Sequence, residues 1–352
     1  MRFVLLSDFA LGLTDDFLPI SDEDRLDTLK NAIKDSADAD AILIPGNIFT
    51  NISPEITDKL NIIFADRNGI DAKIIILLTD EERRMMEELN LDIESADKIF
   101  TKDNEPFLLE KDNEKIYFYG SSRKDDIFLT DKTSEDGFHI GLFNLNIEEY
   151  AENEIEMKTF FKKLPLDFYA LGGINTTKIF KVSGKIIAAY PGHAEAFSAE
   201  ENSAKYSLNI VTSDDSIYEI KRLPLKSTKF VSLTIDCDNS NLNDIEAMVD
   251  ESKNSETRLY IRFDGMRNYP IDNFNLEKKY KSVKIDDNSF PTLKQLSSEI
   301  ETNGMWRDFF DLLNTKQIPE DVDIKELSRM VFCIIKNGSI ISEDWICALL
   351  NA

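Results

Sequence analysis

The first part of the chain alternates short apolar runs with stretches of helical pattern, and this alternation constrains the fold more than any other feature. Buried strands are predicted at three apolar runs, Arg2–Ser7, Asp40–Ile44 and Lys73–Leu78. Helices are predicted after Ser21 and Ser53, whose hydroxyls can cap a first turn, and over about Asp80–Glu88. Strands that alternate with helices of this length indicate an α/β layer architecture.

The middle of the chain is richer in strands. Ile116–Gly120 and His139–Phe143 have strand patterns, and Leu145–Leu164 is expected to form a helix. Further strands are predicted at Asp167–Leu171, Lys178–Val182, Lys185–Tyr190, Tyr206–Val211 and Ser216–Leu223. The glycines of Gly172-Gly173 and Ser183-Gly184 permit the turns between them.

The pattern changes after about Lys226. A compact β-α-β unit is predicted from three segments, Phe230–Ile235, Leu242–Glu251 and Leu259–Phe263. Tyr280–Ile285 is a candidate for an additional strand, and the pattern from Pro291 onward is helical. Four apolar side chains recur there at helical spacing: Trp306, Phe309, Phe310 and Leu313. We therefore expect domains over residues 1–225, 226–290 and 291–352.

Composition narrows the class of protein. With 352 residues, 42% hydrophobic and 30% charged, the chain has the composition of a soluble globular protein. Lys+Arg 41 against Asp+Glu 66 gives a net charge of −25, which repels polyanions and lowers the expectation of direct DNA contact. No apolar run suits a signal peptide or a membrane span, so we expect a cytoplasmic protein without membrane contact. The three cysteines lie too far apart to indicate a disulfide framework or a zinc cluster.

Two short motifs carry a resemblance to a known family. The run Ala170-Leu171-Gly172-Gly173-Ile174-Asn175 ends one predicted strand, and Tyr190-Pro191-Gly192 ends a later one. They resemble motifs of the calcineurin-like metallophosphoesterases, and within them of the SbcD-type DNA double-strand-break repair nucleases. Weaker similarities in the same order lie at Phe3–Gly12, Asp38–Phe49, Lys73–Asp80 and Gly141–Asn144. The resemblance implies a four-layer α/β/β/α sandwich, a small α/β capping domain and a helical C-terminal tail.

The same resemblance implies a degenerate metal site. In that family two metal ions, Mn or Mg, are held by carboxylate, imidazole and amide ligands and activate water for attack on phosphorus. The matching positions here are Asp8, Ala10, Asn47, Thr79, Asp80, Asn144, Gly173 and Asn175. Only Asp8 keeps the ligand in its own motif, and the histidine positions hold alanine, asparagine or glycine. We therefore expect no catalytic residues, no metal and no cofactor.

An alternative remains open at this site. An active DNA nuclease or phosphoesterase could keep a remodelled site around Asp8, with one Mn or Mg ion also bound by Asp80 and Glu81. Acidic residues after a strand are more typical of a helix N-terminus, where the helix dipole favours negative charge. Asp8 itself is then expected to accept hydrogen bonds from loop backbone groups.

The chain has two histidines, which therefore need separate interpretations. His139 begins a predicted strand, and we expect a histidine at the strand edge or in the core rather than a catalytic one. His193 follows Pro191-Gly192, where an exposed loop side chain is expected and a phosphate contact is the alternative.

The predicted partner surface lies in the C-terminal tail. Apolar residues recur there at helical spacing, at Ile324, Leu327, Val331 and Ile335, and a short final helix carries Trp345 and Leu349. The resemblance implies that this helical pair binds an SbcC-type coiled-coil ATPase in DNA repair or processing. Packing of the helices within the chain, a homodimer and a scaffold unrelated to DNA remain open.

One basic cluster interrupts the acidic sequence: Lys278, Lys279, Lys281 and Lys284 surround Tyr280. Such lysines can contact a phosphate backbone, or they can protect an exposed strand edge from pairing. The net charge of −25 favours the edge, so DNA contact is expected only within a complex.

Overall fold

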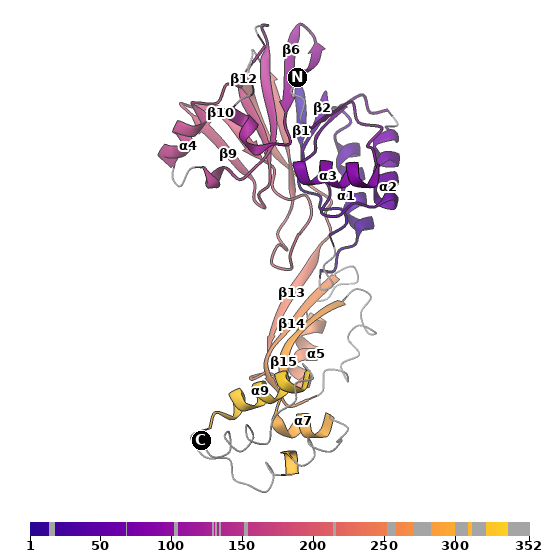
Figure 1. The fold of residues 1–352 in the computed structure, drawn as a ribbon, viewed down its shortest axis with the longest axis vertical. Helices are drawn as coiled ribbons and strands as arrows, with labels where there is room; N and C mark the ends of the chain where they lie inside the picture. Colours follow the sequence, from indigo (N-terminus) through magenta and orange to yellow (C-terminus); the bar gives the residue numbers. More distant parts are fainter. Residues whose placement is uncertain are drawn as a thin grey trace. The chain divides into compact units, whose positions relative to one another are not determined.

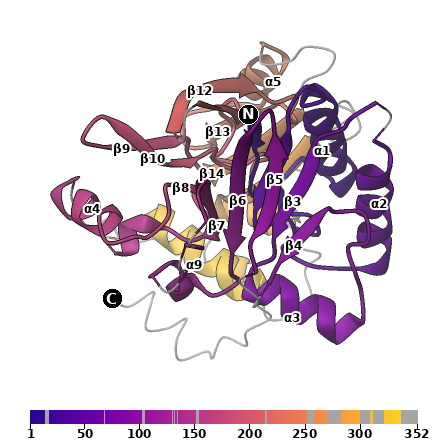
Figure 2. The ribbon, with the colours of Figure 1, turned by 90° about the horizontal axis from the view of Figure 1, so that it is seen from above.

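The structure of the protein is a computed structural model (Figures 1 and 2). It describes residues 1–13, 18–67, 69–101, 105–128, 130, 132–133, 135–150, 154–213, 216–251, 258–269, 283–299, 309–311 and 322–336, without the side chains of 154, 155 and 299. The chain divides into two units. The first comprises Met1–Asp15 and Ile20–Thr228, and the second comprises Asp16–Pro19 and Lys229–Ala352.

Two six-stranded sheets form the centre of the first unit. The first sheet has the order β12 (Ser216–Pro224), β11 (Tyr206–Ser213), β1 (Arg2–Leu5), β2 (Ala41–Pro45), β3 (Lys73–Leu77) and β4 (Lys98–Phe100). The second sheet has the order β5 (Phe107–Lys111), β6 (Glu114–Gly120), β7 (Phe138–Asn144), β8 (Phe168–Gly172), β10 (Lys185–Tyr190) and β9 (Lys178–Val182). In the first sheet β1, β2, β3 and β4 are parallel, and β11 is antiparallel to both β1 and β12. In the second sheet β6, β7, β8 and β10 are parallel, and β5 and β9 are antiparallel to their neighbours.

The sheets pack face to face because alternate side chains of each strand point to opposite faces. Phe3 and Leu5 of β1 face inward and contact the second sheet through residues such as Phe118 and Ile140. Val4 of β1 faces outward, into the cluster formed with the helices that cover the first sheet. These helices are α1 (Asp22–Asp35), α2 (Pro54–Ala65) and α3 (Asp80–Leu89).

The outer face of the second sheet is covered by shorter elements. They are the 3₁₀ turns η1 (Lys124–Phe128) and η2 (Ile147–Glu149) and the helix α4 (Glu154–Phe161). The order of layers is therefore helices, sheet, sheet, helices (Figure 2). The expected four-layer α/β/β/α sandwich is confirmed.

The predicted helix starts after Ser21 and Ser53 are also confirmed. The Ser21 side chain accepts a hydrogen bond from the backbone N–H of Asp24, whose carboxylate in turn accepts from the Ser21 N–H. The Ser53 side chain accepts from the backbone N–H of Ile56 and so caps α2, whose first residue is a proline.

The second unit contains a three-stranded parallel sheet. Its order is β13 (Phe230–Asp236), β14 (Arg258–Arg267) and β15 (Val283–Pro291), with α5 (Leu242–Glu251) packed on one face. The expected β-α-β unit is therefore present, and Pro291 ends a strand. Helices α7 (Leu293–Glu299) and α9 (Ile324–Lys336) share a separate apolar cluster with Phe309 and Phe310.

Leu145–Leu164 does not form the single helix expected from its pattern. Only η2 and α4 are helical there, and residues 151–153 lie outside the described chain. The Leu145 N–H donates to the Gly172 carbonyl at 3.1 Å, and the Leu145 carbonyl accepts from the Tyr190 hydroxyl at 2.9 Å. These hydrogen bonds hold Leu145 at the end of the second sheet, and the first helical turn begins at Ile147.

The C-terminal expectations are met only in part. Ile324 is 53% exposed, whereas Leu327 and Val331 are 5% and 0% exposed and pack in the α7–α9 cluster. Leu327 and Val331 therefore have a structural role within the unit, and Ile335 is partly buried against the same cluster. Trp345, Leu349 and the lysines 278, 279 and 281 lie outside the described residues, while Lys284 is exposed on β15, a terminal strand of its sheet. Within the described chain, no helix has the length and apolar character needed to cross a membrane.

Candidate functional site

Three of the predicted metal-site positions meet where strands of both sheets end. Asp8 follows β1, Asn47 follows β2 and Gly173 follows β8. The Asn47 side-chain amide donates to Asp8 Oδ1 at 2.6 Å, and the Gly173 N–H donates to Asp8 Oδ2 at 3.0 Å. The Ser7 hydroxyl donates to the same Oδ2 at 2.5 Å. Both carboxylate oxygens of Asp8 are thus engaged by donors from the protein itself.

Three residues of these loops have left-handed backbone conformations. Asp8, Ala10 and Asn47 have φ angles of 59°, 53° and 54°, which are costly for residues with a side chain. The Ala10 N–H donates to the Asn47 carbonyl at 3.2 Å, so the two loops hold each other. The Ala10 methyl group is buried and offers no ligand atom.

Asn144 and Thr79 lie beside the same loops. The Asn144 amide donates to the Pro45 carbonyl at 2.9 Å. A side chain at Gly46 would place its Cβ 2.8 Å from the Thr79 methyl group, and a Cβ at Gly173 would lie 3.0 Å from Asn144 Oδ1. Because Gly173 also has a φ of 97°, a histidine at this position would be strained. Asn175 is exposed on the loop that follows.

Asp80 and Glu81 belong to a helix start, as the helix interpretation predicted. Thr79 caps α3, and Asp80 pairs with Arg83 and Arg84 of the same helix at 2.7 and 2.6 Å. Glu81 is exposed. These contacts therefore do not support the remodelled single-ion site, which would require both acids to lie near Asp8.

Glu82, which the sequence interpretation missed, is the acid of α3 that reaches the loops. It is 1% exposed, and its carboxylate accepts from the backbone N–H groups of Phe49 and Thr79 at 2.9 and 2.8 Å. Burial raises the pKa of Glu82, and these backbone hydrogen bonds oppose the rise. The Thr-x-x-Glu spacing of a capping box was a signal for its role.

His193 also lies at this end of the sandwich, and the expectation of an exposed loop residue is wrong. Its side chain is 12% exposed, its Nδ1 lies 2.9 Å from Glu201 Oε2, and its ring stacks on Phe197 at 3.9 Å. The next residue, Ala194, donates its N–H to the carbonyls of Ser7 and Asp8 at 3.0 and 3.2 Å. The loop after β10 is therefore joined to the loop after β1.

The charges of this group are coupled. Burial raises the pKa of Asp8, and the nearby His193 opposes that rise together with the three donated hydrogen bonds. Burial also disfavours ionisation of Glu201, but His193 and Lys205 outweigh it and lower its pKa to about 2. Lys205 Nζ lies 3.0 Å from the Glu201 carboxylate. His193 thus lies between two acids, Asp8 and Glu201.

His139, by contrast, is a core residue, as expected. It is 3% exposed, stacks on Tyr117 at 5.1 Å, and its Nδ1 lies 2.9 Å from the Tyr119 hydroxyl.

The residues at this site do not fit a pair of Mn or Mg ions. Such ions need several free oxygen or imidazole ligands, but Ala10 and Gly173 have none and both Asp8 oxygens already accept hydrogen bonds. Among the described residues, no group of three or more His, Cys, Asp or Glu side chains is placed to hold a metal ion.

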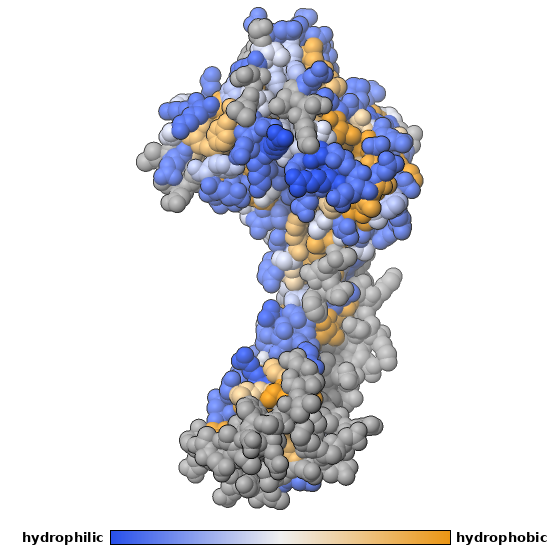
Figure 3. Space-filling view, viewed as in Figure 1, coloured by the Kyte–Doolittle hydropathy of each residue, from blue (hydrophilic) through white to orange (hydrophobic). Residues whose placement is uncertain are grey.

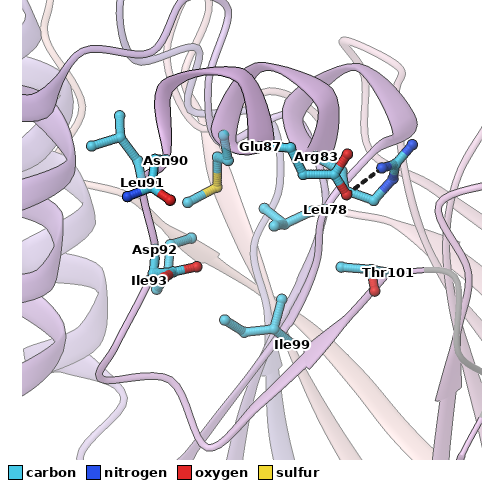
Figure 4. A pocket seen from close by; sticks show the side chains of 10 residues that line it. Leu78, Arg83, Glu87, Asn90, Leu91, Asp92, Ile93, Ile99 and Thr101 are labelled. Atoms are coloured by element: carbon cyan, nitrogen blue, oxygen red, sulfur yellow. Dashed lines mark hydrogen bonds and ion pairs between the residues drawn. The ribbon is translucent and has the colours of Figure 1, made fainter.

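A cavity of about 400 Å³ lies under α3, away from these loops (Figure 4). Leu78, Met86 and Ile99 are among its apolar walls, and the Arg83 guanidinium at its side is paired with Glu87 at 2.5 Å. The charge of Arg83 is therefore compensated within α3.

Comparison with known proteins adds one finding. No family model and no curated protein sequence matches the chain. Among solved structures it is similar to a protein described as a novel archaeal phosphodiesterase, with 13% identity, a TM-score of 0.34, and coverage of 64% of this chain and 100% of that one.

Proposed function

We propose that this chain is a catalytically inactive SbcD-like subunit. In this proposal it is a structural or regulatory partner of an SbcC-type coiled-coil ATPase in the cytoplasm, in DNA repair or processing. Function belongs to sites rather than to folds, so a phosphoesterase-like sandwich can persist as an assembly module after its site is lost.

The observation that supports the proposal is that both carboxylate oxygens of Asp8 accept hydrogen bonds from the protein. Three protein donors, from Ser7, Asn47 and Gly173, take up the carboxylate that would otherwise face a metal ion. The loops are thus held together by internal hydrogen bonds, and the nearby His193 ring is engaged by Glu201. A subunit built in this way keeps its shape without metal, which is what a structural role requires.

The partner surface in this proposal comprises two exposed apolar side chains of α9. Leu327 and Val331 anchor the helix, while Ile324, at the start of the same apolar stripe, is 53% exposed and Met330 is 36% exposed. Exposed apolar side chains on an anchored helix are suitable anchors for a partner's groove.

Co-expression with an SbcC-type ATPase from the same genome tests this proposal. We expect the wild-type chain to co-purify with the ATPase, and the double variant Ile324→Asp/Met330→Asp to lose it with an unchanged melting temperature. Met248→Asp is the matched control, because Met248 is 42% exposed on α5 of the same unit. Failure of the wild-type chain to co-purify would contradict the proposal.

A second candidate is an active nuclease or phosphoesterase with a remodelled site around Asp8. One observation favours it: the Nδ1 atom of His193 faces Glu201, and a carboxylate at one imidazole nitrogen is an arrangement that general acid–base catalysts use. Hydrolysis of bis(4-nitrophenyl) phosphate in Mn²⁺ or Mg²⁺ distinguishes the candidates. Activity that His193→Asn abolishes would favour the enzyme, and we expect none above the protein-free rate.

A further inference from the structure

A second hollow of the first unit has features that the proposed function does not use. It has a volume of about 360 Å³, within the size range of small-molecule sites. It lies where β7 and β8 begin, with Phe138 and Asp167 in its wall, and so at the opposite end of these strands from Gly173. The turn between β9 and β10 and the start of β12 complete it.

Two β-bulges direct side chains into this hollow. In the pairing of β10 with β9, Ile186 lies opposite Lys181 and Ala188 opposite Phe180, which leaves Ile187 as the extra residue. In the pairing of β11 with β12, Val211 lies opposite Glu219 and Thr212 opposite Ile217, which leaves Tyr218 as the extra residue. Both extra residues line the hollow. Bulges re-aim side chains and are frequent beside functional sites, so their coincidence here is informative.

The charge of the hollow is opposite to that of the chain. Its wall contains the lysines Lys181 and Lys185, neither of which forms an ion pair among the described residues. The Asp167 carboxylate is already engaged, by Lys132 Nζ at 2.5 Å and by the His139 N–H at 3.0 Å. The described wall of the hollow therefore includes two exposed lysines without an ion pair, in a protein with a net charge of −25.

Protection of a sheet edge explains only part of this arrangement. β9 is the terminal strand of the second sheet, so an exposed lysine such as Lys181 is expected on it. Lys185 lies where β10 pairs with β9 alone, so edge protection can account for both lysines. It does not account for Tyr218, which leaves 75% of its surface exposed on the terminal strand β12.

We propose that this hollow binds a nucleotide, with the base stacked on Tyr218 and the phosphate held by Lys181 and Lys185. The planar base can stack on the exposed ring of Tyr218, and the base or sugar can contact the apolar side chain of Ile187. The negatively charged phosphate is attracted by the two lysines. Nucleotide binding at this hollow does not depend on assembly of the chain with an ATPase. A free nucleotide and the phosphorylated end of a single strand share this chemistry.

Isothermal titration calorimetry with adenosine 5′-monophosphate tests the site. We expect saturable binding by the full chain, with adenosine alone and inorganic phosphate alone each at least about tenfold weaker. Lys181→Ala/Lys185→Ala and Tyr218→Ala should each weaken binding about tenfold, and Tyr218→Phe should retain it. Lys178→Ala is the matched control, because Lys178 lies on β9 outside the hollow and is paired with Glu148.

A 5′-phosphorylated thymidine oligonucleotide of about eight nucleotides separates the two sources. Tighter binding than the mononucleotide identifies a strand end, and weaker binding identifies a free nucleotide. Absence of binding at millimolar nucleotide, equal affinity for inorganic phosphate, or variants that bind like the wild type would each overturn the proposal. The mutated side chains are exposed lysines and a 75% exposed tyrosine, so loss of folding is not expected, and unchanged melting of each variant verifies this.

Discussion

At the scale of single residues, Asp8 is a buried carboxylate whose partners are all donors. Asp8→Asn places an amide NH₂ group against one of these donors, since an amide has one acceptor oxygen instead of two. We expect a loss of about 1–3 kcal/mol in the free energy of unfolding, measured by urea denaturation. Asp58→Asn, an exposed position on α2, is the control and should change stability by less than about 0.5 kcal/mol. Equal stability of both variants would show that the hydrogen bonds to Asp8 are not structural.

The ionisation of Glu201 should make the free energy of unfolding depend on pH. Its pKa is lowered from 4.5 to about 2 in the folded chain, so its ionised form stabilises the fold above pH 4.5. That contribution, roughly 1–3 kcal/mol, is lost as the pH falls from about 4.5 toward 2. The difference in unfolding free energy between wild type and Glu201→Gln should therefore be present at pH 5, and shrink as the pH falls below 4.5. A difference that does not depend on pH would contradict the pairing with His193 and Lys205.

At the scale of elements, the start of α3 is the clearest link between a helix cap and the site. Glu82 accepts from the backbone of the loop after β2 as well as from its own helix cap, and it is 1% exposed. Glu82→Gln should cost about 2 kcal/mol, because one carboxylate oxygen becomes a donor that faces backbone N–H groups. Glu81→Gln, at the exposed neighbouring position, should cost less than about 0.5 kcal/mol in the same thermal or urea melts.

Helix starts and buried strands could be predicted from local sequence patterns, whereas contacts between distant segments could not. Caps and buried strands are local signals, so the starts of α1 and α2 and the strands β1, β2 and β3 were predicted close to their observed bounds. The start of Leu145–Leu164 is bonded to Tyr190, which is distant in the sequence. A local sequence pattern cannot indicate such a contact. The positions of Asp8, Asn47 and Gly173 could be predicted from motifs, but the engagement of His193 by Glu201 could not, since both residues belong to an irregular loop. The bulges at Ile187 and Tyr218 depend on strand register, which periodicity alone does not fix.

At the scale of the whole molecule, the net charge of −25 sets the response to polyanions. Hydrophilic residues predominate on the face of the first unit shown in Figure 3. We expect weak or no binding of duplex DNA by the isolated chain at physiological salt, measured by fluorescence anisotropy, because binding requires compensation of phosphate charges. Submicromolar affinity with a steep salt dependence, lost on charge reversal of Lys278 and Lys281, would show that the basic cluster binds DNA directly.

The central claim is that the loops around Asp8 hold their shape without a divalent ion. Elemental analysis of the purified chain, after equilibration with Mn²⁺ and removal of free ion, tests it most directly. The account predicts far less than one manganese per chain and no nuclease activity above background. About two tightly bound manganese ions per chain, together with nuclease activity that Asp8→Ala abolishes, would contradict it.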